Sequence, residues 1–255
     1  KKAFITGITG FAGSFLAENL VGEGVYEISG TYLTEESLKN ISNIQSKVKI
    51  HKVDLQDAST VARIVAEEKP DLIFHLAALT APGKSFDNPG EIITNNISVQ
   101  VNVLEAVRAA NAEPKILIVS SAEVYGNVGP SDLPIDEETK LQPVNPYAVS
   151  KVAQDFIGLQ YFLSYKMPII RVRPFNHIGP RQSPSFAVAS FSKEIAELEK
   201  SSHNSIMKVG NLSAKRDLTD VRDTVRGYQL LLEKGEPGEI YNIGSGRSYK
   251  IKYLL

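Results

Sequence analysis

The 255-residue chain has no cysteine, no long hydrophobic run and no block of like charge. The lack of cysteine excludes disulfides and thiol catalysis. No apolar run approaches the roughly 20 residues that a membrane-spanning helix needs. The net charge is −1, so we expect no nucleic-acid partner and no membrane-surface partner. The first residues lead directly into glycines without the features of a secretory signal. We therefore expect a cytoplasmic protein.

Short apolar runs alternate with longer amphipathic runs along most of the chain. The predicted strands span residues 2–6, 26–31, 48–54, 72–77, 115–120, 168–172 and 239–243. The predicted helices span residues 11–22, 60–69, 92–110, 147–165, 185–199 and 220–234. Continuous apolar strands separated by helices favour βαβ units, in which helices cover both faces of a parallel sheet. The predicted fold class is therefore α/β, with a doubly wound, Rossmann-type parallel sheet.

The regular pattern weakens after residue 173, where prolines and glycines indicate irregular backbone. We predict a smaller C-terminal substrate-binding lobe made of residues 174–217 and 244–255, with a short strand at residues 207–210. Residues 1–173 and about 218–243 form the predicted nucleotide-binding domain. The last residues are typical of the start of another helix, so the lobe is expected to be incomplete.

Residues 6–13 join the first predicted strand to the first helix and contain the spacing G-x-x-G-x-x-G. Glycines allow a tight turn there and let the backbone approach a diphosphate, while the helix N-terminus offers unpaired N–H groups. An ordinary glycine-rich turn is the alternative, but the strand before it and the helix after it favour a dinucleotide site. The candidate cofactor-binding residues of the turn are Gly7, Thr9, Gly10, Phe11, Ala12 and Gly13.

The end of the second predicted strand, at Thr31, bears on the choice of cofactor. An acidic residue there would bind the ribose 2′-hydroxyl of NAD and repel a 2′-phosphate. Neither an acidic residue nor an arginine is present, which favours NADP(H) and leaves NAD(H) possible. Asp54, after the third strand, could contact the adenine region or simply cap the strand.

Tyr147 and Lys151 are four residues apart on a predicted helix, so their side chains project from the same face. An ammonium beside a phenol favours the phenolate and lowers the pKa of the tyrosine. Such a tyrosine can exchange a proton with a substrate hydroxyl. The spacing alone is common on helices, and a pair of surface residues is the alternative.

With the glycine turn, Tyr147, Lys151 and a serine after a buried strand, the chain resembles the extended short-chain dehydrogenases/reductases over nearly its whole length. Residues 75–78, 120–126 and 173–176 also match motifs of that family. The resemblance implies that Tyr147 is the acid/base, that Lys151 binds the nicotinamide ribose, and that Ser121 orients the substrate oxygen. It extends the expected cofactor site to Leu55, Leu76, Ala77, Ala78 and Pro174.

Extended members of that family mostly act on nucleotide-diphosphate sugars, and the second half of the chain resembles them too. The resemblance implies that Asn176 contacts the sugar diphosphate and that Arg216 grips a phosphate, which suits the planar donors of arginine. An ion pair with Asp217 or Asp220 is the structural alternative for Arg216. Further candidates for substrate contact are Lys84, Ser85 and Arg181.

Within the family, residues 173–184, 209–212 and 233–239 look most like GDP-4-keto-6-deoxy-D-mannose reductases. This implies NADP(H)-dependent reduction of the C4 ketone to GDP-D-rhamnose, with Tyr147 as proton donor. However, Glu123 occupies the place of the glutamate that abstracts the C5 proton in GDP-mannose 4,6-dehydratases. A dehydratase is therefore the alternative, followed by a 4-epimerase and by a non-enzymatic NADP-binding sensor or scaffold. Many relatives dimerise through helices flanking the sheet, so we expect a homodimer.

Overall fold

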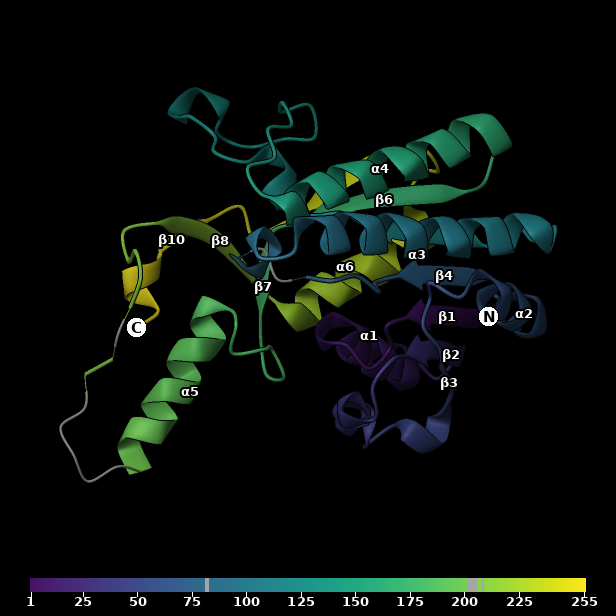
Figure 1. Cartoon of the computed structure of the whole chain (residues 1–255), viewed down its shortest axis with the longest axis horizontal. Helices are drawn as coiled ribbons and strands as arrows, with labels where there is room; N and C mark the ends of the chain where they lie inside the picture. The colour runs from purple at the N-terminus through teal and green to yellow at the C-terminus, as the bar shows by residue number, and fades with distance from the viewer. Residues whose placement is uncertain (81–82, 201–205, 208) are drawn as a thin grey trace.

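The computed structural model describes residues 1–80, 83–200, 206–207 and 209–255, and its centre is a seven-stranded parallel sheet (Figure 1). The strand order is β3-β2-β1-β4-β5-β6-β9. The strands are β1 (Lys2–Thr6), β2 (Glu27–Tyr32), β3 (Val48–Lys52), β4 (Leu72–His75), β5 (Lys115–Val119), β6 (Ile169–Pro174) and β9 (Ile240–Ile243). This order confirms the predicted doubly wound sheet.

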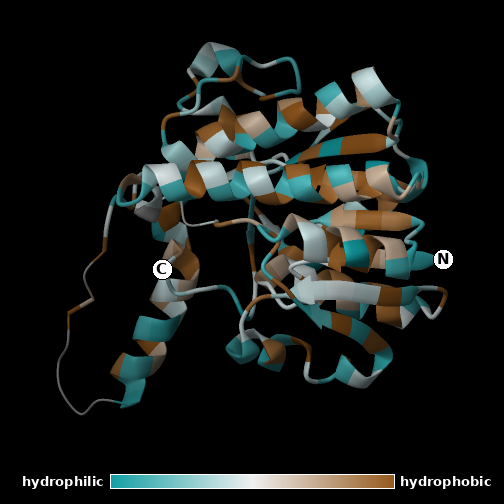
Figure 2. Ribbon diagram, turned by 45° about the vertical axis from the view of Figure 1, so that its right-hand side comes forward, coloured by the Kyte–Doolittle hydropathy of each residue, from teal (hydrophilic) through white to brown (hydrophobic). Residues whose placement is uncertain are grey.

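Helices cover both faces of the sheet. On one face, α1 (Phe11–Glu23) and α6 (Val221–Lys234) pack with strand residues such as Ile5 and Phe74. On the other face, α2 (Ala58–Glu68), α3 (Pro89–Ala109) and α4 (Pro146–Tyr165) enclose a second core that includes Phe4 and Ile73. Neighbouring strand residues point to opposite faces, so each strand needs apolar residues throughout. Figure 2 shows brown segments on strands of the main sheet, with paler and teal residues among them.

The start of α4 follows directly from its sequence. Asn145 is the N-cap, and its side-chain oxygen accepts a hydrogen bond of 2.7 Å from the backbone N–H of Ala148. Pro146 occupies the first turn, where no backbone N–H is required. The helix therefore begins immediately before Tyr147, which places this residue at the end of the helix that lies nearest the carboxyl ends of the strands.

A smaller, three-stranded sheet has the order β10-β8-β7 and lies beyond those carboxyl ends (Figure 1). Its strands are β7 (Asn176–Ile178), β8 (Lys215–Asp220) and β10 (Ser248–Lys250), and α5 (Ala187–Lys200) belongs to the same part of the chain. β7 and β8 are parallel, whereas β8 and β10 are antiparallel. Because β8 leads directly into α6, it crosses the boundary that we placed between residues 217 and 218, and the domain division stays a prediction.

Two expectations for this region were wrong. Residues 206, 207, 209 and 210 do not form a strand, and Lys208 lies outside the described residues. The end of the chain forms β10 and a short 3-10 turn (Ile251–Tyr253) instead of the start of an α-helix. The physical reason is pairing at long range, because β10 is held in extended form by its register with β8.

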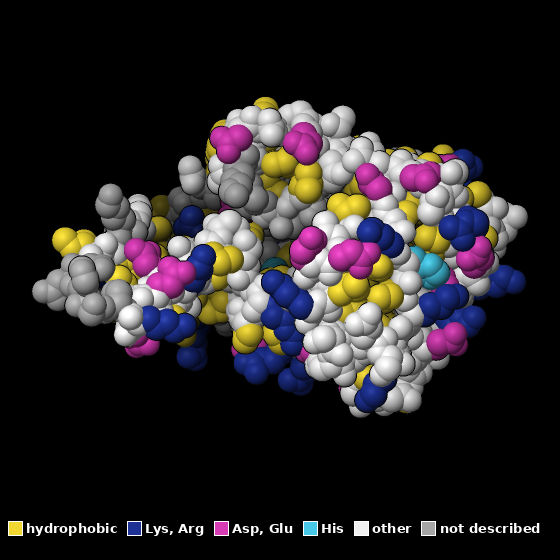
Figure 3. All heavy atoms as spheres, turned by 60° about the horizontal axis from the view of Figure 1, so that its bottom comes forward, with side chains coloured by type: hydrophobic (Ala, Val, Ile, Leu, Met, Phe, Trp, Pro, Cys, Tyr) yellow, Lys and Arg dark blue, Asp and Glu magenta, His cyan; other side chains and the backbone are white. Residues whose placement is uncertain are grey.

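Charge and hydropathy on the outside are mixed. Figure 3 shows Lys and Arg side chains interspersed with Asp and Glu over the face that it presents. In the part of the chain that the structure describes, no helix has the length and apolar character needed to cross a membrane.

Candidate active site

The sheet order reverses between β1 and β4, and ligands of such sheets bind at the carboxyl ends of the strands beside this point. The glycine turn follows β1 at this position. Gly7 has a φ of +71°, which favours glycine, and a Cβ on Gly13 would lie 2.1 Å from the carbonyl oxygen of Gly7. Glycine is therefore required at both places for the turn and the first helix to pack together.

The N-terminus of α1 fits a dinucleotide diphosphate. Its N-cap, Gly10, provides no side-chain cap, and its first turn contains no acidic residue. The first N–H groups of a helix have no intrahelical partner, and they attract anions together with the helix dipole. The residues present therefore suit a phosphate group at this end of α1.

The side chains around the turn fix its shape. The hydroxyl of Thr31 accepts a hydrogen bond of 3.2 Å from the N–H of Gly7, and the hydroxyl of Thr9 lies 2.7 Å from that of Ser37. Asp54 accepts a hydrogen bond of 2.9 Å from the N–H of Gln56, as expected of a cap at a strand end. Its contact with adenine stays a prediction, as does that of Leu55, whose side chain is in the core.

The end of β4 is tied to the end of β1 through one hydroxyl. Thr6 Oγ1 accepts hydrogen bonds of 3.1 Å from the N–H groups of Leu76 and Ala77. Its own proton is thus directed to Nδ1 of His75, 3.0 Å away. Burial, together with the charge of Lys151, lowers the pKa of His75 to about 3, so the imidazole is neutral. These hydrogen bonds therefore tie the end of β1 to the residues that precede Ala78.

The loop after β5 and the first turn of α4 bring Ser121, Glu123 and Tyr147 together. Tyr147 is buried, and the hydroxyl of Ser121 is close enough to influence its pKa. Ser121 caps the short 3-10 helix Ala122–Tyr125 by accepting a bond of 3.2 Å from the N–H of Glu123. Glu123 in turn accepts a 3.3 Å hydrogen bond from the amide of Asn145. The hydroxyl, the phenol and the carboxylate thus lie close together, and their roles stay predictions.

Lys151 lies one helical turn further along α4 and is 4% exposed. Its ammonium donates to the carbonyl oxygen of Val119 at 2.9 Å and to Oε1 of Gln154 at 2.8 Å. Its third N–H forms no hydrogen bond with the residues that the structure describes and remains available to a ligand. Burial lowers the pKa of Lys151 to about 7.

The expected effect of Lys151 on Tyr147 is wrong for this structure. Burial raises the pKa of Tyr147 above its ordinary value; the hydrogen bond from Ser121 acts against this rise, and the charge of Glu123 adds to it. The ammonium of Lys151 lies 5.8 Å from the centre of the phenol ring and is directed at Val119 and Gln154. Desolvation therefore outweighs the attraction that the sequence suggested.

The predicted sugar-diphosphate contacts fall on the smaller sheet. Asn176 is exposed at the start of β7, two residues after Pro174, and Arg216 is exposed on β8. Neither Asp217 nor Asp220 pairs with Arg216 in the described structure, because Asp217 accepts hydrogen bonds from Ser245 and Asp220 pairs with Arg222. Arg216 donates only to the carbonyl oxygen of Lys215, at 2.8 Å. Its guanidinium is therefore free of any acidic partner in the described structure.

Arg181, another predicted substrate contact, is bound to residues of α1. Its guanidinium donates to Ser14 at 3.0 Å and to Glu18 at 2.7 Å, and it covers the ring of Phe15 at 4.2 Å. These partners are all on α1, so the structure links Arg181 to the helix after the glycine turn. Ser85 is buried, and the side chain of Lys84 is outside the described residues.

Gln154 and Asn145 contact the predicted site residues but were missed from the sequence. Gln154 bridges Lys151 to α3, because its amide nitrogen donates to the carbonyl oxygen of Asn96 at 2.9 Å. Its position three residues after Lys151 on a helix was a usable signal. Asn145 could have been found as an N-cap before a proline.

A glycine turn at the switch point of a parallel sheet, together with a Ser–Tyr–Lys set at the adjacent strand ends, is the arrangement of an extended short-chain dehydrogenase/reductase. The chain belongs to the GDP-mannose 4,6-dehydratase family, whose model matches residues 4–255.

Similar proteins include reductases and dehydratases of nucleotide sugars. The chain is 33% identical over 255 residues to GDP-6-deoxy-D-mannose reductase of Pseudomonas aeruginosa, covering all of this chain and 78% of that protein. It is 31% identical over 266 residues to GDP-mannose 4,6-dehydratase of Vibrio cholerae, covering all of this chain and 70% of that protein. The solved structure of RMD from Pseudomonas aeruginosa complexed with NADPH has a TM-score of 0.85 and 32% identity, with 99% of this chain and 79% of that chain covered.

Proposed function

We propose that the protein catalyses the NADP(H)-dependent reduction of the C4 ketone of GDP-4-keto-6-deoxy-D-mannose to GDP-D-rhamnose. The observation that carries the proposal is the buried phenol of Tyr147, which lies in one site with Ser121 and Lys151. The similarity to a GDP-6-deoxy-D-mannose reductase over the whole of this chain supports the substrate.

Tyr147 acts as the proton donor in this proposal. When bound, a reduced nicotinamide supplies the hydride for C4. Tyr147 transfers its proton to the C4 oxygen as the carbon–hydrogen bond forms, so the ketone becomes a secondary alcohol and the tyrosine becomes a phenolate. Ser121, the neighbour of Tyr147, directs its single hydroxyl proton to the same oxygen and stabilises its developing charge. Lys151 binds the nicotinamide ribose with the N–H that is not bound to Val119 or Gln154.

In this proposal, the cofactor lies on one side of Ser121, Tyr147 and Lys151, and the sugar diphosphate of the substrate lies on the other side. The glycine turn and the N-terminus of α1 hold the cofactor diphosphate, while Asn176 and Arg216 bind that of the substrate. The end of β2 lacks an acidic residue, which supports NADP(H). The likeness to an NADPH complex agrees with this preference.

Two incubations test the proposal. The protein is mixed with NADPH and either GDP-4-keto-6-deoxy-D-mannose or GDP-mannose, while NADPH absorbance and the sugar products are followed. We expect stoichiometric NADPH consumption with the ketone and none with GDP-mannose. Conversion of GDP-mannose to the keto sugar without net cofactor change refutes the reductase proposal.

Glu123 supports a dehydratase as the second candidate, because its carboxylate lies in the same site as Ser121 and Tyr147. In a dehydratase, a base at this place removes the C5 proton, and Glu123→Gln then abolishes product formation. In a reductase, Glu123 serves as a hydrogen-bond acceptor only, and Glu123→Gln retains at least about a tenth of the turnover. The variant therefore discriminates between the two reactions.

We also propose that two copies of the chain pair through α4. Its outer side exposes Val149, Phe156 and Leu163, at 42%, 51% and 56%, and their spacing of seven residues places them in one stripe. Burying this stripe against a second copy removes apolar surface from water. Sedimentation is expected to show a dimer that Phe156→Asp converts to a monomer. Leu230→Asp, on the exposed side of α6 (48%), is the control and should remain dimeric; unchanged dimers of Phe156→Asp overturn the proposal.

A further inference from the structure

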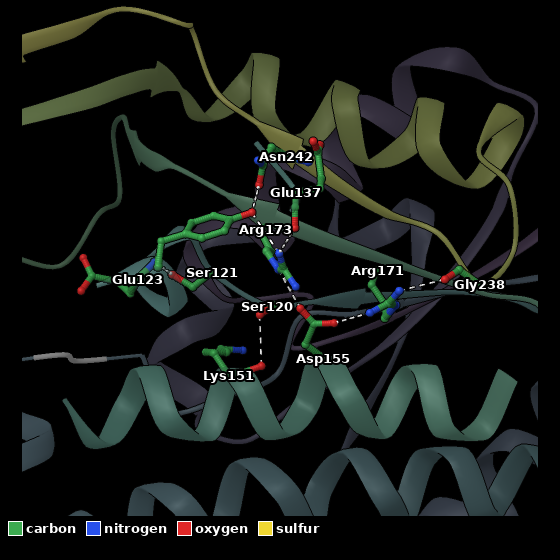
Figure 4. A network of polar contacts seen from close by, with 11 residues as sticks. Ser120, Ser121, Glu123, Glu137, Lys151, Asp155, Arg171, Arg173, Gly238 and Asn242 are labelled. Carbon is green, nitrogen blue, oxygen red and sulfur yellow. Dashed lines mark hydrogen bonds and ion pairs between the residues drawn. The ribbon is translucent and has the colours of Figure 1, made fainter. Parts of the chain in front are cut away.

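A buried polar network connects β6 to two segments of the proposed site (Figure 4). One is the loop that contains Ser121, and the other is α4, which contains Tyr147 and Lys151. Asp155 on α4 is fully buried and accepts one guanidinium on each carboxylate oxygen, from Arg171 at 2.6 Å and from Arg173 at 2.8 Å. The two arginines are two residues apart on one face of β6 and are 7% and 4% exposed. Buried charges of this kind need partners on every side.

Arg173 extends this network to the loop that contains Ser121. Its terminal nitrogen donates to the hydroxyl of Tyr125 at 3.0 Å and to the carbonyl oxygen of Glu137 at 3.0 Å. Because a guanidinium has only donors, the hydroxyl must accept from it, and its own proton goes to Oδ1 of Asn242 at 2.8 Å. The guanidinium also lies over the ring of Tyr125, at 5.2 Å from the ring centre.

The two ends of this connection belong to the two segments that must meet for catalysis. Tyr125 ends the single 3-10 turn that begins after Ser121. Asp155 lies one helical turn after Lys151 on α4, the helix that also holds Tyr147. Arg173 is the one described side chain that hydrogen bonds to both Tyr125 and Asp155. In Figure 4, Arg173 lies above Asp155, which projects from the helix of Lys151, and the Ser121–Glu123 segment lies to its left.

We propose that Arg173 is a positioning residue that, through Asp155 and Tyr125, holds Ser121 in hydrogen-bonding register with Tyr147. The inference rests on the proposed function, because the register matters only if Ser121 and Tyr147 act on one substrate oxygen. Arginine suits this place because its planar, rigid fork presents several donors in fixed directions, whereas a lysine ammonium is a compact charge on a flexible stem. A displacement of about 1 Å between reacting groups can cost a hundredfold in rate.

Tyr125→Phe is the sharpest perturbation, since it removes one oxygen and keeps the ring over Arg173. We expect kcat to fall about tenfold or more, with NADPH affinity unchanged. In a Ser121→Ala background, the same substitution is expected to change kcat by less than about twofold, because residues acting as one unit are not additive. An equal loss in both backgrounds overturns the inference.

Two further variants separate positioning from general stability. Tyr161→Phe removes a matched hydroxyl, which donates to Glu105 at 2.7 Å at the far end of α4, and it should leave kcat unchanged. Arg173→Lys keeps the charge opposite Asp155 and is expected to lower kcat as Tyr125→Phe does. Retention of wild-type kcat by Arg173→Lys overturns the inference.

A crystal structure of Tyr125→Phe gives a readout that does not depend on the substrate. We expect the Ser121 hydroxyl to lie more than about 0.5 Å further from Tyr147; an unchanged position overturns the inference even if kcat falls. Failure of the proposed function is a separate result, because it is seen in the wild-type protein as the absence of NADPH consumption with the keto sugar.

Discussion

The burial of Lys151 predicts an unusual dependence of stability on pH. The pKa of this lysine is about 7 in the folded protein, against an ordinary value of 10.5. Between these values the unfolded chain binds a proton that the folded protein does not, so the free energy of unfolding rises with pH. The stabilisation is complete above pH 10.5 and is lost as the pH falls through 7. Each pH unit contributes at most about 1.4 kcal/mol.

Urea denaturation in a series of buffers measures this effect. From about pH 7.5 to about pH 9.5 we expect the free energy of unfolding to increase by about 2 to 3 kcal/mol because of Lys151. Lys151→Met removes the titrating group and should remove this increase. Lys193→Met, an exposed lysine on α5 whose side chain is 58% exposed, is the control and should retain it. Equal slopes for wild type and Lys151→Met would refute the reasoning.

The remaining predictions concern three single residues. Tyr147→Phe is expected to lower turnover roughly 10²- to 10⁴-fold with little change in NADPH binding, measured by steady-state kinetics and fluorescence titration; persistent turnover rejects Tyr147 as the proton donor. Gly13→Ala places a Cβ 2.1 Å from a backbone oxygen and should cost roughly 1–3 kcal/mol of stability and weaken NADPH binding. Asp155→Ala leaves two buried guanidiniums without their carboxylate and should cost roughly 3–5 kcal/mol in urea denaturation.

The main sheet could be predicted because each of its strands carries its own signal. Residues such as Phe4 and Ile5 face opposite cores, so strands buried on both sides are continuously apolar in sequence. The glycine turn could be predicted for a similar local reason, because backbone contacts within the turn require glycine at positions 7 and 13. Local patterns thus predicted the main sheet and the glycine turn.

The smaller sheet and the pairing of charges could not be predicted in this way. β8 consists mainly of polar residues and is a strand only because β7 and β10 pair with it. The sequence shows Arg171 and Arg173 on one face of a strand, but not that Asp155 of α4 lies between them. Likewise, the side chain of Lys151 points to the carbonyl oxygen of Val119, and no local sequence pattern reveals this contact.

The protonation states bear on the choice between reductase and dehydratase. A C5 proton becomes acidic only next to a C4 ketone, so dehydration of GDP-mannose must begin by taking a hydride and a proton from the C4 alcohol. That step needs Tyr147 as a base, whereas ketone reduction needs it as an acid. Burial raises the pKa of Tyr147 and lowers that of Lys151 to about 7, which keeps the phenol protonated at neutral pH. The resting site is therefore prepared for proton donation, and Glu123, whose charge also raises the pKa of Tyr147, reinforces that state.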